Sequence, residues 1–422
     1  MRSLLIALLL TSAVVAEEEE TATPAVAEPS CVTHCHGKEA EAYRLDIHRD
    51  SLACIDCHGG DPTAQRDKLR SHDPAKGFVG TPARRTIPEL CGGCHSDPVR
   101  MAFRDIATDQ LAHYRVSKHG RAVLDRGDDR AAVCSDCHGA HGIRPRSDPN
   151  ALTAAENLPA MCGSCHSDPE LMAAFGLPSD TVSIFLTSIH GRTLEAGETR
   201  GSPTCIDCHG KHGATAPRFG SVVQVCSHCH ANTGREYERG AHHRSEEMRC
   251  DSCHEEEGQE FRRYACTACH GVHGIQAPGE EIYTGEGPGS CFHCHREPDA
   301  AHALVETIIG KRDDLLTVMR ETRDSVEAAK RRGLFLDHEE IYLRESNRAL
   351  IALGPLSHSL ESDRISAHLE QGMRRQDRTR DKIEKQQVVL RDRRLVLLVA
   401  AFLFLLLAAL LLIKLRALRR LS

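Results

Sequence analysis

The chain of 422 residues contains no tryptophan, and only 4% of its residues are aromatic. So few aromatic side chains cannot fill an ordinary hydrophobic core of this size. Positive charge is not in excess either, because the formal net charge is −7 at pH 7. This charge balance excludes the usual nucleic-acid-binding surface. Something other than aromatic packing must therefore fill the interior.

No cysteine stands alone. All 20 belong to ten closely spaced pairs, and a histidine follows the second cysteine of every pair. Nine motifs have the strict CxxCH spacing, whereas the first, CVTHCH, has one extra residue between its cysteines. The motifs are Cys31/Cys35/His36, Cys54/Cys57/His58, Cys91/Cys94/His95, Cys134/Cys137/His138, Cys162/Cys165/His166, Cys205/Cys208/His209, Cys226/Cys229/His230, Cys250/Cys253/His254, Cys266/Cys269/His270 and Cys291/Cys294/His295.

CxxCH is the attachment site of c-type haem. Its two thiols bond the macrocycle covalently, and the adjoining, or proximal, histidine becomes an axial iron ligand. Zinc ribbons and redox sites also use CxxC, whereas a disulfide has no use for the repeated histidine. Ten copies with no cysteine left over predict about ten covalently bound haem c groups. The spacing of CVTHCH leaves attachment at Cys31 and Cys35 open.

Two apolar runs lie near the ends of the chain. Residues 1–16 have the charged start, the apolar stretch and the small final residues of a secretory signal peptide. Export would place the cysteines where c-type haem is attached in bacteria. Residues 395–413 hold no charge, and as a helix of about 28 Å they are long enough to cross a bilayer. We therefore expect a single-pass protein of the cytoplasmic membrane with its haem region in the periplasm.

The fold class expected from these features is mainly α, with extensive irregular loops wrapped around a chain of haems. Antiparallel helices, broken at Gly333 and Gly354-Pro355, and one transmembrane helix should follow. The expected segments are a signal peptide (1–16), an acidic linker (17–30), a multihaem cytochrome c domain of four haem-pair modules plus two extra haems (31–298), a helical domain (299–394), the transmembrane helix (395–413) and a basic cytoplasmic tail (414–422).

A module recurs four times in the multihaem region. It opens with an aromatic residue and, five residues later, a histidine, and in three copies Ser or Asp lies two residues before that histidine. A first CxxCHG site and a second CxxCH site follow. The opening histidines are His48, His119, His190 and His242; the first sites begin at Cys54, Cys134, Cys205 and Cys266, and the second sites at Cys91, Cys162, Cys226 and Cys291.

Further histidines are candidates for the second axial ligand, the distal histidine. In three first sites the motif extends to CHGxHG. Its last histidine cannot easily reach the opposite face of its own haem, so we expect it to bind the iron of the next one. The candidates are the opening histidines His48, His119, His190 and His242, the CHGxHG histidines His141, His212 and His273, His72 in SHDP, and His358 after Gly354-Pro355. His243, beside His242, is expected to be a bystander.

The ordered strings CHGGDP, IPELCGGCHSDP, SKHG, CSDCHGAHGI, MCGSCHSDP, SIHG, CIDCHGKHGA and CTACHGVHGI resemble the doubled-CxxCH multihaem cytochromes c, often called the cytochrome c3 family. The resemblance covers residues 31–375 and is specific in the order of the motifs. It implies haems with two histidine ligands, electron transfer outside the cytoplasm and no organic substrate pocket. The C-terminal anchor differs from the N-terminal anchor of multihaem quinol dehydrogenases, which weakens a direct quinol-oxidase function.

Two classes of function remain open. In the first, the chain carries electrons from a membrane donor, a quinol-oxidising complex or another cytochrome, to a periplasmic or extracellular acceptor, and has no catalytic residue. In the second, it is a reductase of a small nitrogen or sulfur oxyanion, with one haem iron left five-coordinate. The chain has no CxxCK motif for a lysine-ligated haem, and its histidines outside the motifs suffice for all ten irons. These features favour the electron carrier.

Overall fold

The computed structural model describes residues 31–421, except 32–34, 65, 198–200, 216–218, 245–264, 278, 280, 286–288, 297 and 335–336. The expected signal peptide and acidic linker lie outside the described residues, as does the motif of Cys250, Cys253 and His254. The described part of the chain is mainly helical and contains no strand, which confirms the mainly α fold. Wrapping of the loops around haems stays a prediction.

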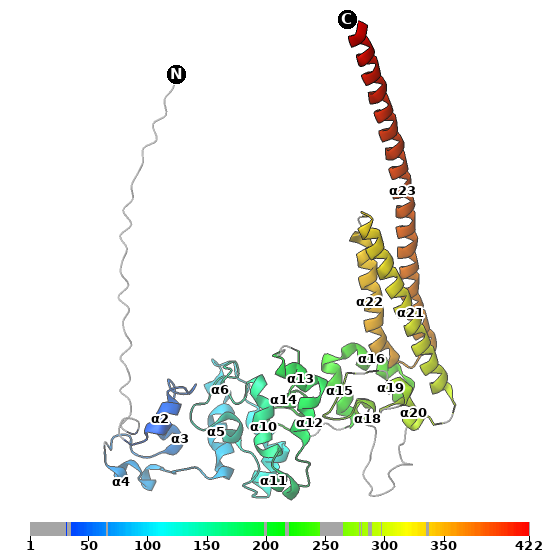
Figure 1. Cartoon of the computed structure of the whole chain (residues 1–422). Coiled ribbons are helices and arrows are strands. Elements are labelled where there is room, and N and C mark those ends of the chain that lie inside the picture. The colour runs from blue at the N-terminus through cyan, green and yellow to red at the C-terminus, as the bar shows by residue number, and fades with distance from the viewer. Residues whose placement is uncertain are drawn as a thin grey trace, which may run out of the picture. The chain divides into compact units, whose positions relative to one another are not determined.

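The chain divides into two compact units, and Figure 1 labels most of their helices. Unit 1 holds the residues up to Thr108 and Ala132–Leu152, and unit 2 holds Asp109–Ala131 and the residues from Thr153 on. The helices of unit 1 are α2 (Gly37–Tyr43), α3 (Cys54–His58), α4 (Lys68–Ser71), α5 (Ile87–His95), α6 (Pro98–Met101) and α9 (Cys134–His138), with short turns η1 (Pro74–Lys76) and η2 (Arg84–Thr86).

Unit 2 contains the remaining described helices. They are α7 (Gln110–Val116), α8 (Lys118–Gly120), α10 (Leu158–His166), α11 (Pro169–Ala174), α12 (Thr181–Thr187), α13 (Ile189–Glu195), α14 (Cys205–His209), α15 (Phe219–Cys229), α16 (Ala231–Arg239), α17 (Ala241–Arg244), α18 (Ala265–His270), α19 (Glu281–Thr284), α20 (Cys291–Cys294), α21 (Ala300–Arg331), α22 (Asp337–Ser357) and α23 (Ser362–Leu421), with short turns η3 (Arg121–Asp125) and η4 (Ala155–Asn157).

The first-site motifs of α3, α9 and α14 fix both ends of their own short helices. The aspartate of CxDCH accepts a hydrogen bond from the backbone N–H of the residue before the first cysteine, at 2.6–2.7 Å. This bond caps the helix N-terminus. The glycine of CHG ends the helix with a positive φ of 68° at Gly59, 83° at Gly139 and 82° at Gly210, which suits glycine alone. The proximal histidine therefore lies in a last turn that is held on both sides.

The CHSDP sequences after two second sites start the next helix. Asp97 and Asp168 each accept two backbone N–H bonds from the first turn of α6 and α11, respectively. A proline follows each aspartate at the first helical position, where its missing N–H costs nothing. The proximal histidines at the ends of α5 and α10 are thus followed by a sharp change of chain direction.

The SxHG sequences form tight corners that position two opening histidines. Ser117 and Ser188 are fully buried, and each Oγ accepts the N–H of the SxHG glycine, at 2.9 Å and 3.0 Å. A Cβ atom on that glycine would collide with the carbonyl of the module's aromatic residue, Tyr114 or Phe185. The recurring aromatic, serine and glycine positions therefore allow α8 and α13 to fold closely against α7 and α12.

The helices α21, α22 and α23 pack side by side around one apolar cluster. Its members are Ile308, Leu315, Met319, Ala349, Leu353, Ile365 and Leu369, all buried. The break after α21 falls at Gly333, whose φ is +88°. The break expected at Gly354-Pro355 falls later, because α22 continues through Pro355 to Ser357. A proline in the last turn disturbs only the end of the hydrogen-bond ladder, so the helix tolerates it.

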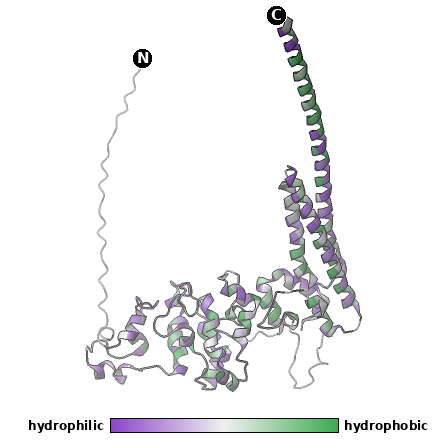
Figure 2. Cartoon of the chain, in the orientation of Figure 1, coloured by the Kyte–Doolittle hydropathy of each residue, from purple (hydrophilic) through white to green (hydrophobic). Residues whose placement is uncertain are grey.

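The C-terminal part of α23 extends beyond α21 and α22 and is hydrophobic (Figures 1 and 2). It is the described segment that is long and apolar enough to cross a bilayer, and its apolar stretch is exposed along its whole length. These properties are compatible with the expected transmembrane helix.

Candidate haem-ligating site

Within the described residues, eight pairs of histidine rings lie near each other with centroids 5.9–6.3 Å apart. Each pair joins one proximal histidine to one distal candidate. The pairs are His36–His72, His95–His48, His58–His141, His166–His119, His230–His190, His209–His273, His295–His242 and His270–His358.

The separation of the rings is that of two ligands on opposite sides of one metal ion. Metal–imidazole bonds are about 2 Å long and the ligating nitrogen lies about 1 Å from the ring centre, so trans imidazoles have centroids about 6 Å apart. Two ligands of a tetrahedral ion would lie closer, at about 5 Å. The residues present therefore fit a haem iron bound from both faces, with the motif cysteines beside the proximal ring to hold the macrocycle.

The pairing follows a rule across the modules. Each opening histidine lies opposite the second-site histidine of its own module, as in His48–His95 and His190–His230. The CHGxHG histidines His141 and His273 lie opposite the first-site histidine of the preceding module. Each thus faces the histidine of another motif, but the expectation that it serves the next haem along the chain was wrong. At the end of the series, His358 of the helical region lies opposite a first-site histidine, His270.

Two further predicted ligands, one proximal histidine and one distal candidate, belong to different units. His138 lies at the end of α9 in unit 1, and His212 lies after α14 in unit 2. His243, the expected bystander, has its ring against Tyr237, with centroids 5.5 Å apart.

Six of the paired histidines are in environments that favour their neutral form. Burial lowers the pKa of His95, His166, His190, His242, His270 and His273, and a neighbouring histidine adds to the effect in each case. Neutral imidazole is the form that binds a metal ion.

Several paired rings have their Nδ1 atom hydrogen-bonded, which leaves Nε2 for a metal. Backbone carbonyl oxygens lie 2.8 Å from Nδ1 of His58, 3.1 Å from that of His209 and 2.8 Å from that of His358. Carboxylate oxygens lie 2.9 Å from Nδ1 of His48 and 2.6 Å from that of His295. The aspartate two residues before His48 is visible in the sequence. Its hydrogen bond to the ring of His48 was not predicted from the sequence.

The first cysteines of successive motifs lie close together. The thiols of Cys91 and Cys134 are in hydrogen-bonding contact, as are those of Cys162 and Cys205 and those of Cys226 and Cys266. Each contact joins a second site to the first site that follows it. Macrocycles attached to these cysteines would be close neighbours.

The sequence also predicted the second cysteines of the motifs as haem-attachment residues. Four of them share one position in their helices. Each of the four lies in the last turn of its helix, directly before the proximal histidine. They are Cys94 of α5, Cys137 of α9, Cys165 of α10 and Cys269 of α18; the first three are half-buried and Cys269 is exposed.

The contacts of these second cysteines are mostly local. The Arg100 guanidinium donates to Sγ of Cys94 at 3.2 Å, and the hydroxyl of Ser164 lies 3.9 Å from Sγ of Cys165. The pKa of Cys134 is raised chiefly by its hydrogen bond with Cys91, and the adjacent Cys137 adds to the effect.

The pKa of Cys266 is raised chiefly by the hydrogen bond with Cys226, and the nearby Cys269 raises it further. Both thiols of a motif thus lie on one side of its short helix, near enough to influence each other. Covalent attachment of haem at Cys94, Cys137, Cys165 and Cys269 stays a prediction from the motif.

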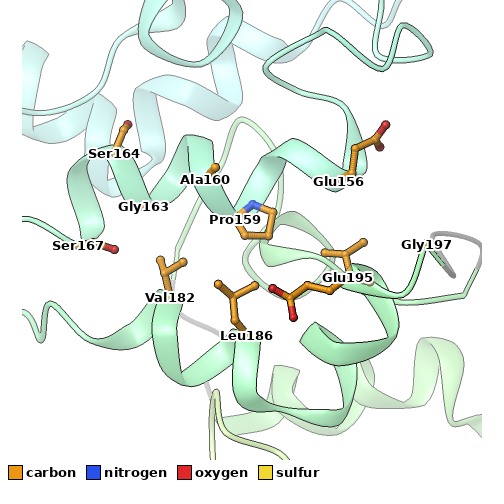
Figure 3. A pocket seen from close by; sticks show the side chains of 11 residues that line it. Glu156, Pro159, Ala160, Gly163, Ser164, Ser167, Val182, Leu186, Glu195 and Gly197 are labelled. Atoms are coloured by element: carbon orange, nitrogen blue, oxygen red, sulfur yellow. The ribbon is translucent and has the colours of Figure 1, made fainter.

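A cavity of about 1030 Å³ lies between α10, α12 and α13 (Figure 3). Its walls include Glu156, Glu195, Val182 and Leu186. Part of the lining comes from α10, including Gly163, and the described lining residues include no basic side chain. A wall with two carboxylates and no positive charge does not suit an anionic substrate.

Comparison with known proteins agrees with the site. The family described as "Doubled CXXCH motif" matches residues 126–171 and 259–300. No curated protein and no solved structure matches the chain. The family match and the CxxCH motifs together indicate a multihaem c-type cytochrome with covalently bound haem, and a haem region outside the cytoplasm is typical of such proteins.

Proposed function

We propose that the protein is a membrane-anchored periplasmic decahaem cytochrome c that carries electrons between a quinol-linked membrane donor and a periplasmic or extracellular acceptor. The eight histidine pairs carry this proposal, because an iron held by such a pair has no position open for a substrate. A bound haem would supply an iron that gains and loses one electron. The chain's residues hold that iron, bury it and bring it near the next one.

The contacts between motifs support a route in chain order. In unit 1, burial raises the pKa of Cys54 and of Cys57, and the nearby thiols of Cys31 and Cys91, respectively, add to the effect. Cys91 also contacts Cys134. In unit 2, the series runs from Cys162 to Cys205 and from Cys226 to Cys266. Within each unit an electron would therefore pass between haems that follow one another in the sequence.

The helical region bears on the donor. His358 lies just before α23, and Arg364 in the first turn of α23 binds Glu236 of α16 through two hydrogen bonds, of 2.8 Å and 3.2 Å. The part of α23 between Ser362 and Leu395 is about 50 Å long at the helical rise. Electron tunnelling decays exponentially with distance, so quinol in the bilayer cannot reduce the His270–His358 haem directly. A quinol-oxidising partner protein, as donor, would bridge the gap.

Mass spectrometry of the intact protein, matured in a host that attaches c-type haem, tests the proposal. We expect a mass increase equal to nine or ten haems. A count of nine with Cys31 and Cys35 open to alkylation would identify the CVTHCH motif as the unprocessed one. A protein that carries zinc and no haem would overturn the proposed function.

A further inference from the structure

The histidine pairs differ in what holds the ring nitrogen that faces away from the metal position. Asp46 is buried, with 4% of its surface exposed. Its Oδ1 accepts hydrogen bonds from the backbone N–H of His48 at 2.8 Å and from the ring Nδ1 of the same residue at 2.9 Å. His58, His209 and His358 have a neutral carbonyl at the corresponding nitrogen.

The same carboxylate also reaches a second distal segment. Its Oδ2 accepts the N–H of Ile143 at 2.8 Å, two residues after His141, and the Ile47 N–H donates to the Ile143 carbonyl at 2.8 Å. Asp46 thus fixes the backbone beside His48 and beside His141, which lie opposite His95 and His58. One buried side chain holds the distal ligand segments of two neighbouring haems.

The repeat shows that this carboxylate is an addition to a common framework. The bond between Ile47 and Ile143 recurs between Ile189 and Ile275, at 2.8 Å. The residue equivalent to Asp46 there is Ser188, whose hydroxyl caps α13. The corner therefore forms without a carboxylate, so the charge of Asp46 is not required to build it.

We infer that Asp46 is a positioning residue that lowers the reduction potential of the haem held by His48 and His95. A buried carboxylate that accepts the Nδ1 proton makes a charge-assisted hydrogen bond and raises the basicity of the ligating nitrogen. A more basic ligand and a nearby negative charge both stabilise ferric iron over ferrous iron. Asp299 at His295 has the same chemistry, but 43% of its side chain is exposed and it also binds His302, so solvent weakens its effect.

This inference rests on the proposed function and deepens it, since it predicts unequal potentials along unit 1. Electrons would reside on the neighbours of the His48–His95 haem and pass through that haem without accumulating on it. The chain would then have a potential step at a defined position.

The test compares three variants of the full chain by redox titration of the haem absorbance, with intact mass as the measure of haem load. Asp46→Asn keeps the shape and removes the charge. It should raise the ferrous to ferric ratio of one haem at least tenfold, equivalent to about 59 mV for one electron. Asp50→Asn removes a charge from the same segment at a side chain that is 81% exposed, and should change nothing. Ser188→Asp, a residue that can also cap the helix, should lower the potential of one haem of unit 2.

The inference is overturned if fully loaded Asp46→Asn protein titrates like the parent, or if Asp50→Asn gives an equal shift. Should Asp46→Asn protein lose a haem, Ser188→Asp decides, and an unchanged titration at full haem load overturns the inference. A parent protein without covalent haem would instead overturn the proposed function, which the mass shows before any titration.

Discussion

The C-terminal helices and the cysteine-bearing segments are stabilised in different ways. In α21, α22 and α23, apolar side chains form one continuous cluster, and Leu315, Ile365 and Leu369 have no exposed surface. In the described segments that carry the CxxCH motifs, many of the buried apolar residues are alanines. Histidines from distant parts of the sequence lie in pairs there, with room for an ion between the two rings. The first region has a core of its own, whereas we expect the second to depend on haem to supply one.

Withholding haem should give the largest difference between the two regions. When the full chain is produced without the haem-attachment machinery, we expect the segment 31–298 to stay unfolded and the helices from Ala300 to Arg394 to remain folded. Limited proteolysis followed by mass spectrometry measures this, and fragments of the helical region should survive. Equal resistance of both regions would mean that the motif segments fold without their cofactor.

A cavity in the helical core should have a large local effect. Leu315→Ala removes a side chain with no exposed surface from the cluster of α21, α22 and α23, and should lower the free energy of unfolding by about 2–5 kcal/mol. Denaturant unfolding followed by circular dichroism measures the loss. Leu316→Ala, at a side chain that is 39% exposed, is the matched control. A change in the haem absorbance of the folded Leu315→Ala protein would contradict the separation of the two regions.

Exchange of one distal ligand should affect one haem and leave the helical region unchanged. The His242 ring lies 6.2 Å from that of His295, and His242→Met should raise the potential of one haem, because thioether ligation favours ferrous iron. The expected change is at least tenfold in the ferrous to ferric ratio, or about 59 mV. His243→Met alters the adjacent bystander and should leave the titration unchanged. Equal curves for His242→Met and the parent would exclude His242 as a ligand.

The contact between the two regions should be the weakest feature. Arg364 and Glu236 form a partly exposed ion pair, and the hydrogen bonds from Arg364 lower the pKa of Glu236. A double-mutant cycle of Arg364→Gln and Glu236→Gln should give a coupling of about 0.2–1 kcal/mol at neutral pH. Because the pKa of Glu236 is lowered on folding, the coupling should disappear as the pH falls through that pKa. A coupling that persists in acid would exclude a charge interaction.

The sequence predicted the ligands better than their partners. The aromatic–histidine spacing and CHGxHG singled out residues such as His48 and His141 because the chemistry is local and repeated. Which proximal histidine each would face could not be read from the sequence, since it depends on how α-helical corners at Ser117 and Ser188 bring separate segments together. The sequence predicted a helix break at Gly354-Pro355, whereas α22 continues to Ser357. Tertiary packing outweighs the local helix-breaking signal there.

Electron paramagnetic resonance of the oxidised, haem-loaded protein tests the central claim most directly. The account predicts at least eight low-spin haems per chain, six of which fall into two geometric kinds. The ring planes of His36–His72 and His48–His95 are nearly perpendicular, at 89° and 86°, and should give strongly anisotropic signals. Those of His58–His141, His209–His273, His242–His295 and His270–His358 lie within 22° of parallel and should give rhombic signals. Fewer than eight low-spin haems, with the remainder high-spin, would contradict paired histidine ligation and favour a reductase with open iron sites.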